Sequence, residues 1–117
     1  MAETISYGDF MKLDIRIGKI IEAEKAEGAD KLMKMQVDFG EVDGKPAKRQ
    51  IVASIADFYK PEGLIGKQCP FLFNLEPKAF RGHESQGMIL AIDDKGDRSD
   101  CVLLHPNKEV KPGAKVV

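Results

Sequence analysis

The stretch KLMKMQVDFGEVDGKPAKRQIVASIA, residues 31–56, decides the fold because its alternating pattern reverses direction at one tight turn. Its first half places four apolar side chains on one face: Met33, Met35, Val37 and Phe39. Alternation with a period of two is typical of a strand that is buried on one side. Asp43-Gly44 is a β-hairpin turn signal, and the alternation resumes after it at Ile51, Ala53 and Ile55. The stretch therefore predicts two antiparallel strands.

Strand-like patterns continue on both sides of this hairpin. In residues 14–26, Ile15 and Ile17 alternate with charged residues, and Gly18 predicts a bulge that bends the strand. A fourth strand is expected in KQCPFLFNL, residues 67–75, with one apolar face made of Phe71, Phe73 and Leu75. A fifth strand is expected in QGMILAID, residues 86–93, which is apolar on both faces and so predicted to be buried.

Only short helices fit the remaining sequence. Ser6 followed by Asp9 resembles an N-cap with an acidic third residue, which predicts one or two helical turns in residues 7–13. Pro61 and its neighbouring glycines exclude a long helix but permit a helical turn at Asp57 to Tyr59. Three strands, a short helical connection and two strands follow the order of an OB barrel. We therefore predict an all-β, five-stranded OB-fold Greek-key barrel over about residues 12–94.

Residues 95–117 extend beyond such a barrel. Residues 101–117 hold two short strand candidates that a five-stranded barrel does not need. Extra apolar strands have to be covered, and a second copy of the chain is the simplest cover. No repeat or linker divides the sequence, which predicts one domain, 1–117, with a C-terminal dimerisation extension.

Composition narrows the class of function. Hydrophobic residues make up 43% and charged residues 32% of the 117 residues, as in soluble globular proteins. No apolar run approaches the roughly 18 residues of a membrane span, and the N-terminus lacks the pattern of a secretory signal, so we expect a cytoplasmic protein without membrane contact. A net charge of −1 does not suit a protein that coats nucleic acid, so nucleic-acid binding would require a local site.

The reactive side chains do not form a catalytic pattern. Cys69 and Cys101 lie in apolar contexts, which favours small buried hydrophobes over a disulfide or a metal-ligand pair. Neither His83 nor His105 has a nucleophile or carboxylate at a recognisable motif spacing, and His83 is expected to be an exposed loop residue. The sequence therefore predicts a non-catalytic protein without a metal or cofactor.

The polar segment EPKAFRGHES, residues 76–85, falls at a loop that flanks the ligand face of OB barrels. Lys78 and Arg81 can reach phosphates, and Phe80 offers a stacking surface. Side chains that can read base edges or sugar hydroxyls surround them: Asn74, Ser85 and Gln86. A solvated turn has the same composition, so the residue types alone leave both interpretations open.

The order of motifs along the chain resembles the tRNA-binding domain family. The resemblance rests on Asn74-Leu75 with Pro77, Arg81-Gly82, Ser85 to Ala91, Asp14 to Ile20, Ala29 to Leu32, Val37 to Gly40, and Ile51-Val52 with Ile55-Ala56. This family includes the C-terminal domain of bacterial methionyl-tRNA synthetases, the β subunit of some archaeal ones and free-standing tRNA-binding proteins. The resemblance implies an OB fold, a homodimer built through the chain ends, and binding to the outer corner or anticodon stem of tRNA.

Position by position, the resemblance implies that five residues face tRNA: Asn74, Lys78, Arg81, Ser85 and Met88. Phe80 and Gln86, chosen for their chemistry, complete the predicted tRNA-binding set. Two alternatives stay open: Met88 can be a core residue, and Asn74 and Ser85 can cap the backbone of their own loop. The sequence departs from the family at Glu76 and Ala79, where basic residues are common, and at Ser54, where glycine is general. Fewer phosphate contacts predict modest affinity, so a dimer that presents two loops would matter more.

These observations predict a structure-specific, sequence-tolerant tRNA-binding module. It would act like a methionyl-tRNA synthetase β subunit or as a trans-acting factor, with tRNA, a second copy and the synthetase's catalytic subunit as candidate partners. The alternative is a CsaA-type homodimeric chaperone, which shares the fold and binds unfolded polypeptide. The form of Ser85-Gln86-Gly87-Met88 favours the tRNA-binding group.

Overall fold

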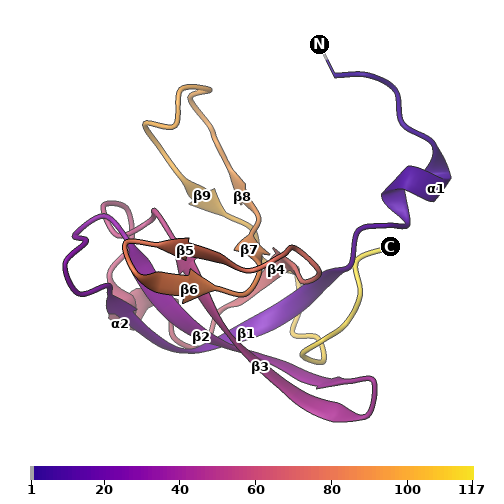
Figure 1. The fold of residues 1–117 in the computed structure, drawn as a ribbon, viewed down its shortest axis with the longest axis horizontal. Coiled ribbons are helices and arrows are strands. Elements are labelled where there is room, and N and C mark those ends of the chain that lie inside the picture. The colour runs from indigo at the N-terminus through magenta and orange to yellow at the C-terminus, as the bar shows by residue number, and fades with distance from the viewer. Residues whose placement is uncertain (1) are drawn as a thin grey trace.

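One curled antiparallel sheet forms most of the molecule (Figure 1). The computed structural model describes residues 2–117. The sheet has five strands in the order β3-β2-β1-β4-β7. Their bounds are β1 Ile15–Lys25, β2 Met33–Val42, β3 Lys45–Ala53, β4 Gln68–Leu72 and β7 Met88–Ile89. This arrangement confirms the predicted all-β fold with an OB-like barrel.

The barrel core follows the alternation of β2. Met33, Met35, Val37 and Phe39 are all fully buried, as predicted. The Phe39 ring packs edge-on against Phe71 and Phe73, at centroid distances of 5.4 and 4.9 Å. The bulge predicted at Gly18 lies instead between Ile20 and Glu22. A side chain at Gly18 would overlap Val37 and Phe39, so this glycine lets the core aromatics approach the β1 backbone.

Several turns and helices follow local sequence signals. Asp43 and Gly44 both have positive φ, 54° and 79°, which confirms the predicted hairpin turn. Helix α1, Tyr7–Phe10, is capped by Ser6, whose side chain accepts a 3.0 Å hydrogen bond from the Asp9 N–H. The helical turn predicted around Asp57 to Tyr59 is present, because the N–H groups of Phe58 and Tyr59 both donate to the Ile55 carbonyl, at 3.0 and 3.1 Å. Helix α2, Pro61–Leu64, follows it and was not predicted. Pro61 begins α2 because the first helical position needs no N–H donor.

The segment predicted as a loop, residues 76–85, is instead a second β-hairpin. Strand β5, Lys78–Phe80, pairs with β6, His83–Ser85. Arg81 and Gly82 form its turn with φ of 51° and 84°. Two successive positive φ angles define the hairpin turn that Asn-Gly usually makes, and arginine at the first position hid this turn from sequence analysis.

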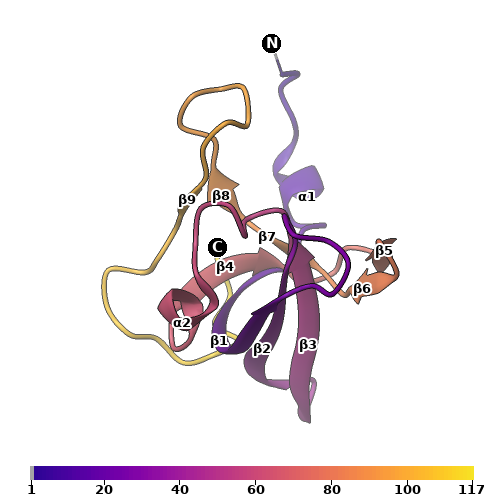
Figure 2. The same cartoon turned by 90° about the vertical axis from the view of Figure 1, so that its left-hand side faces the viewer.

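The fifth predicted strand is divided and only partly buried. Its first part, β7, pairs with β4, whereas β8, Ala91–Ile92, pairs with β9, Val102–Leu103. Ile89 is buried, but Met88 and Ile92 are 44% and 41% exposed, so the prediction of burial on both faces was wrong. Leu75 is also exposed rather than part of the β4 apolar face. Both views show the β8–β9 ladder standing away from the barrel (Figures 1 and 2).

The C-terminal segment returns to the first half of β1. The Ile17 N–H donates to the Ala114 carbonyl at 2.9 Å, and the Val116 N–H donates to the Ile15 carbonyl at 2.8 Å. Lys115 forms an isolated antiparallel bridge with Arg16. Since β2 pairs with β1 only from Lys19 onward, this segment covers the edge that β2 leaves free.

The barrel closes between β3 and β6–β7 through side chains. Backbone bonding is limited here to the Gln86 N–H, which donates to the Gln50 carbonyl at 2.8 Å. The Gln86 side-chain oxygen accepts from the Gln50 N–H at 3.0 Å. The Ser85 hydroxyl accepts from the Val52 N–H and donates to the Gly87 carbonyl, both at 2.9 Å. We call this set of contacts the closing seam.

The closing seam predicts that Ser85→Ala destabilises the protein. Ser85 is only 2% exposed, so its loss leaves the buried Val52 N–H without an acceptor. We expect urea denaturation to show a free energy of unfolding lower by about 1–3 kcal/mol. Ser54→Ala, at an exposed serine just beyond β3, serves as the control and should change stability far less. Equal stability of the two variants would contradict this role of Ser85.

Candidate nucleic-acid interface

A cavity separates the loop after β1 from the turn of the β5–β6 hairpin. Its volume is about 640 Å³. It is lined by Gly28, Ala29, Asp30, Lys31, Leu32, Ala79, Phe80 and Arg81. These are the two loops that flank the ligand face of an OB barrel. We call it the loop–hairpin cavity.

Two contacts hold the hairpin over this cavity. The His83 Nε2 atom lies 2.9 Å from the Glu27 carbonyl oxygen, which ties β6 to the loop after β1. The Phe80 ring packs beside a small buried cluster made of Ala26, Leu32 and Val52. His83 is therefore a half-buried strand residue and not the exposed loop residue that was predicted.

Cations surround the exposed part of Phe80. The Lys78 ammonium lies 5.3 Å from the Phe80 ring centroid, within the range of a cation–π contact. Lys31 and Arg81 reach the same cavity from opposite walls, and both are exposed. None of these three cations forms an ion pair within residues 2–117. An aromatic ring with free cations beside it can stack a base and bind the neighbouring phosphates.

Lys31 was missed as a site residue. It lies in the first of the two flanking loops, within a segment that resembles the family, and its place in an OB barrel was the signal that could have identified it.

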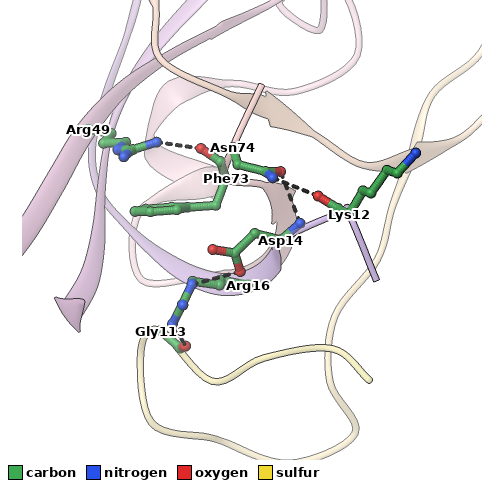
Figure 3. Close-up of polar contacts among 7 residues, drawn as sticks. All are labelled: Lys12, Asp14, Arg16, Arg49, Phe73, Asn74 and Gly113. Carbon is green, nitrogen blue, oxygen red and sulfur yellow. Dashed lines mark hydrogen bonds and ion pairs between the residues drawn. The ribbon is translucent and has the colours of Figure 1, made fainter. Parts of the chain in front are cut away.

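Asn74 has internal partners for both ends of its amide (Figure 3). Its Oδ1 accepts from the Asp14 N–H at 2.9 Å, and its Nδ2 donates to the Lys12 carbonyl at 2.8 Å. It therefore fastens the segment after α1 to the end of β4. This geometry supports the backbone-capping alternative, although the backbone that Asn74 caps belongs to a distant segment rather than to its own loop.

The seven predicted residues do not form one cluster. Phe80 and Arg81 line the loop–hairpin cavity, and Lys78 lies near the Phe80 ring. Ser85 and Gln86 belong instead to the closing seam. Met88 lines a different cavity of about 400 Å³, together with Phe58 and Ile92. Direct contact with tRNA stays a prediction for all seven.

Both thiols have pKa values above the ordinary value. Burial raises the pKa of the Cys69 thiol to about 11. Burial, and then the carboxylates of Asp100 and Asp93, raise the pKa of the half-buried Cys101. Within residues 2–117, no group of three or more His, Cys, Asp or Glu side chains is placed to hold a metal ion.

No helix in the described part of the chain is long and apolar enough to cross a membrane.

Comparison with known proteins connects this geometry to a family. The model of the tRNA binding domain matches residues 15–115. A methionine–tRNA ligase of Thermococcus kodakarensis is 48% identical over 114 residues, which are 97% of this chain and 14% of the ligase. The corresponding ligase of Parabacteroides distasonis is 45% identical over 97% of this chain and 16% of its own length. The chain thus spans about 15% of the curated relatives it matches.

Solved structures agree over the full chain. A MetRS-related protein from Pyrococcus horikoshii superposes with a TM-score of 0.87 at 37% identity, covering 99% of this chain and 100% of that one. The chaperone CsaA of Bacillus anthracis gives a TM-score of 0.84 at 34% identity, covering 98% and 100%. With the family model matched from residue 15 to 115, the chain belongs to the tRNA-binding domain family.

Proposed function

We propose that this chain is a structure-specific, sequence-tolerant tRNA-binding module that acts as an accessory to methionyl-tRNA synthetase. The observation that carries the proposal is the loop–hairpin cavity, where Phe80 stands among Lys31, Lys78 and Arg81. Stacking and phosphate contacts give affinity for an RNA shape without reading its sequence.

Side-chain hydrogen bonds on the outer face of β2 and β3 support binding that does not depend on the sequence of the tRNA. The Gln36 amide donates to the Gln50 side-chain oxygen at 3.0 Å, and the Gln50 amide donates to the Glu84 carbonyl at 2.8 Å. Amides that read base edges need free donors and acceptors in pairs. Because these amides bond each other across three strands, they are poorly placed to distinguish bases.

The proposed role as an accessory to methionyl-tRNA synthetase rests on the similarity to methionine–tRNA ligases and to a MetRS-related protein. The chain corresponds to about 15% of each ligase, and one of its structural neighbours is a MetRS-related protein. We infer a non-catalytic cytoplasmic module that adds tRNA affinity to a catalytic subunit, since binding two parts of one tRNA raises the effective concentration of the second.

We also propose a homodimer. Helix α1 buries none of its residues, and Ile5, Tyr7 and Met11 around it are exposed. The β8–β9 region exposes further apolar side chains: Ile92, Val102 and Leu104. A four-residue helix is not stable by itself in water, so a partner that covers it is required for its apolar side chains to be buried. Two copies would present two loop–hairpin cavities to one tRNA.

A CsaA-type chaperone is the second candidate function. The observation that favours it is the similarity to two CsaA structures, with TM-scores of 0.84 and 0.82. The exposed apolar residues of α1 and the β8–β9 ladder offer a surface for unfolded polypeptide.

Competition distinguishes the two functions. Labelled total tRNA is titrated with the protein at low and near-physiological salt while fluorescence anisotropy is recorded. We expect unlabelled tRNA to displace the label and single-stranded RNA or a reduced, unfolded polypeptide to fail, because the proposed module recognises the folded shape of tRNA. Displacement by the polypeptide, with tRNA bound only at low salt, would establish the chaperone instead.

Arg81→Ala and Lys78→Ala should each weaken tRNA binding. Each removes one phosphate contact, so the slope of log K against log salt should fall in magnitude by about one unit. Both side chains are exposed, so the thermal midpoint should stay near that of the wild type. Lys67→Ala removes an exposed cation outside the cavity and should change neither affinity nor slope. Unfolding of either cavity variant would contradict this placement.

The dimer proposal predicts that Ile92→Glu yields a folded monomer. A carboxylate inside an apolar interface cannot be buried without a partner, so association should be lost. Light scattering after size exclusion measures the mass of both proteins. Ile65→Glu, at an exposed isoleucine beside α2, should remain dimeric. A monomeric wild-type protein that binds tRNA at full affinity would refute the dimer and leave the tRNA site standing.

A further inference from the structure

A second groove lies at the base of the β5–β6 hairpin. It consists of two adjoining cavities of about 350 and 480 Å³. They share five lining residues: Val42, Asp43, Arg49, Phe73 and Gln86. Asn74, Leu75 and Pro77, which lead into β5, line one side. The loop–hairpin cavity touches the turn end of the same hairpin, so the two openings adjoin its opposite ends. We call the second opening the Arg49 groove.

Arg49 is held against Phe73 (Figure 3). Its guanidinium carbon lies 3.5 Å from the Phe73 ring centroid, which is a close stack. Its Nη1 group donates to the Phe73 carbonyl and, at 3.4 Å, to the Gln86 carbonyl. Nε and Nη2 have no hydrogen-bond partner among the described residues. These two nitrogens form the side-on fork that matches a carboxylate or phosphate.

The Arg49 charge is only partly compensated inside the protein, by Asp14. Burial lowers the pKa of Arg49, and Arg16 lowers it further, while Asp14 opposes both. The Asp14 carboxylate, however, lies 2.9 Å from the Arg16 Nε and is committed to that ion pair. No carboxylate of residues 2–117 lies within 4 Å of Arg49. A bound anion would offset the cost of the half-buried cation.

The rim of the groove is positive. Lys45 and Lys48 line it beside Arg49. The carboxylates of Asp43 and Asp14 line it too, and Asp14 is paired with Arg16. A chain with a net charge of −1 therefore gathers three cations against one free carboxylate at this place. Such a local excess attracts an anionic polymer even when the whole molecule does not.

We propose that Arg49 is a second phosphate-binding residue, whose free Nε and Nη2 take a phosphodiester oxygen pair of the tRNA backbone. The inference rests on the proposed function and extends it: tRNA would contact both ends of the β5–β6 hairpin. The Phe73 ring is covered by the Arg49 guanidinium, so the groove is built for a phosphate rather than for a stacked base.

Nitrogen-15 NMR of the wild-type protein tests contact directly. The sequence has four arginines, at 16, 49, 81 and 98, so their Nε–H signals can be assigned individually. On addition of total tRNA, we expect the signals of Arg49 and Arg81 to shift and those of Arg16 and Arg98 to stay. A shift of the Arg81 signal without a shift of the Arg49 signal would overturn the inference and leave the proposed function intact. A shift of Arg49 caused by unfolded polypeptide but not by tRNA would also overturn it.

Salt dependence separates a phosphate contact from a structural role. For Arg49→Gln we expect the slope of log K against log salt to fall in magnitude by about 0.7–0.9, so its deficit in tRNA affinity shrinks about threefold between 50 and 200 mM salt. Arg49→Lys keeps the charge without the fork, so it should lose affinity but keep the slope.

Lys67→Gln, which removes one exposed cation elsewhere, should match the wild type. A weaker Arg49→Gln variant with an unchanged slope would show a structural role alone and refute the proposal. If Arg49→Gln does not fold, the NMR titration of the wild type and the salt slope of Arg49→Lys decide whether Arg49 contacts phosphate. Absence of tRNA binding by the wild type would refute the proposed function itself, together with this inference.

Discussion

The barrel depends on a seam that side chains complete. Where β3 meets β6 and β7, Ser85 and Gln86 accept the hydrogen bonds of the Val52 and Gln50 N–H groups. A buried N–H group without an acceptor costs more than an ordinary hydrogen bond gains, so this edge could not close on van der Waals contact alone. Because side chains complete the seam, the backbone of residues 76–84 is free to leave the barrel wall as a separate hairpin.

Contacts at both of its ends fix that hairpin, which suits the binding role proposed for it. At its turn end, His83 contacts the Glu27 carbonyl and Phe80 packs on the small cluster. At its base, Arg49 donates to the carbonyl of Phe73, before the hairpin, and to that of Gln86, after it. One arginine therefore both positions the hairpin and presents its remaining donors to the groove. Rigid presentation matters because every side chain ordered on binding subtracts from affinity.

The sequence predicts those features that depend on residues close together in the chain. The period of two in β2, the Ser6 cap and the Asp43-Gly44 turn depend on residues a few positions apart, and the structure confirms them. Apart from the local Arg81-Gly82 turn, the errors concern contacts between distant residues. Asn74 is bonded to backbone 60 and 62 positions away, and Ser85 to backbone 33 positions away. Gly18 was predicted as a bulge because its true constraint, the Phe39 ring, comes from another strand.

Net charge is a poor guide to nucleic-acid binding in this chain because its ion pairs are unevenly placed. Asp9, Asp14 and Glu24 are paired with Lys12, Arg16 and Lys34, away from the turn of the hairpin. The cations near the hairpin, Lys31, Lys78, Arg81 and Arg49, have no such partner in the described chain. Paired charges contribute little field at a distance, whereas free ones act over about 10 Å at moderate salt. So few free cations limit the affinity expected of one hairpin, and the proposed second copy and the proposed Arg49 contact would each add to it.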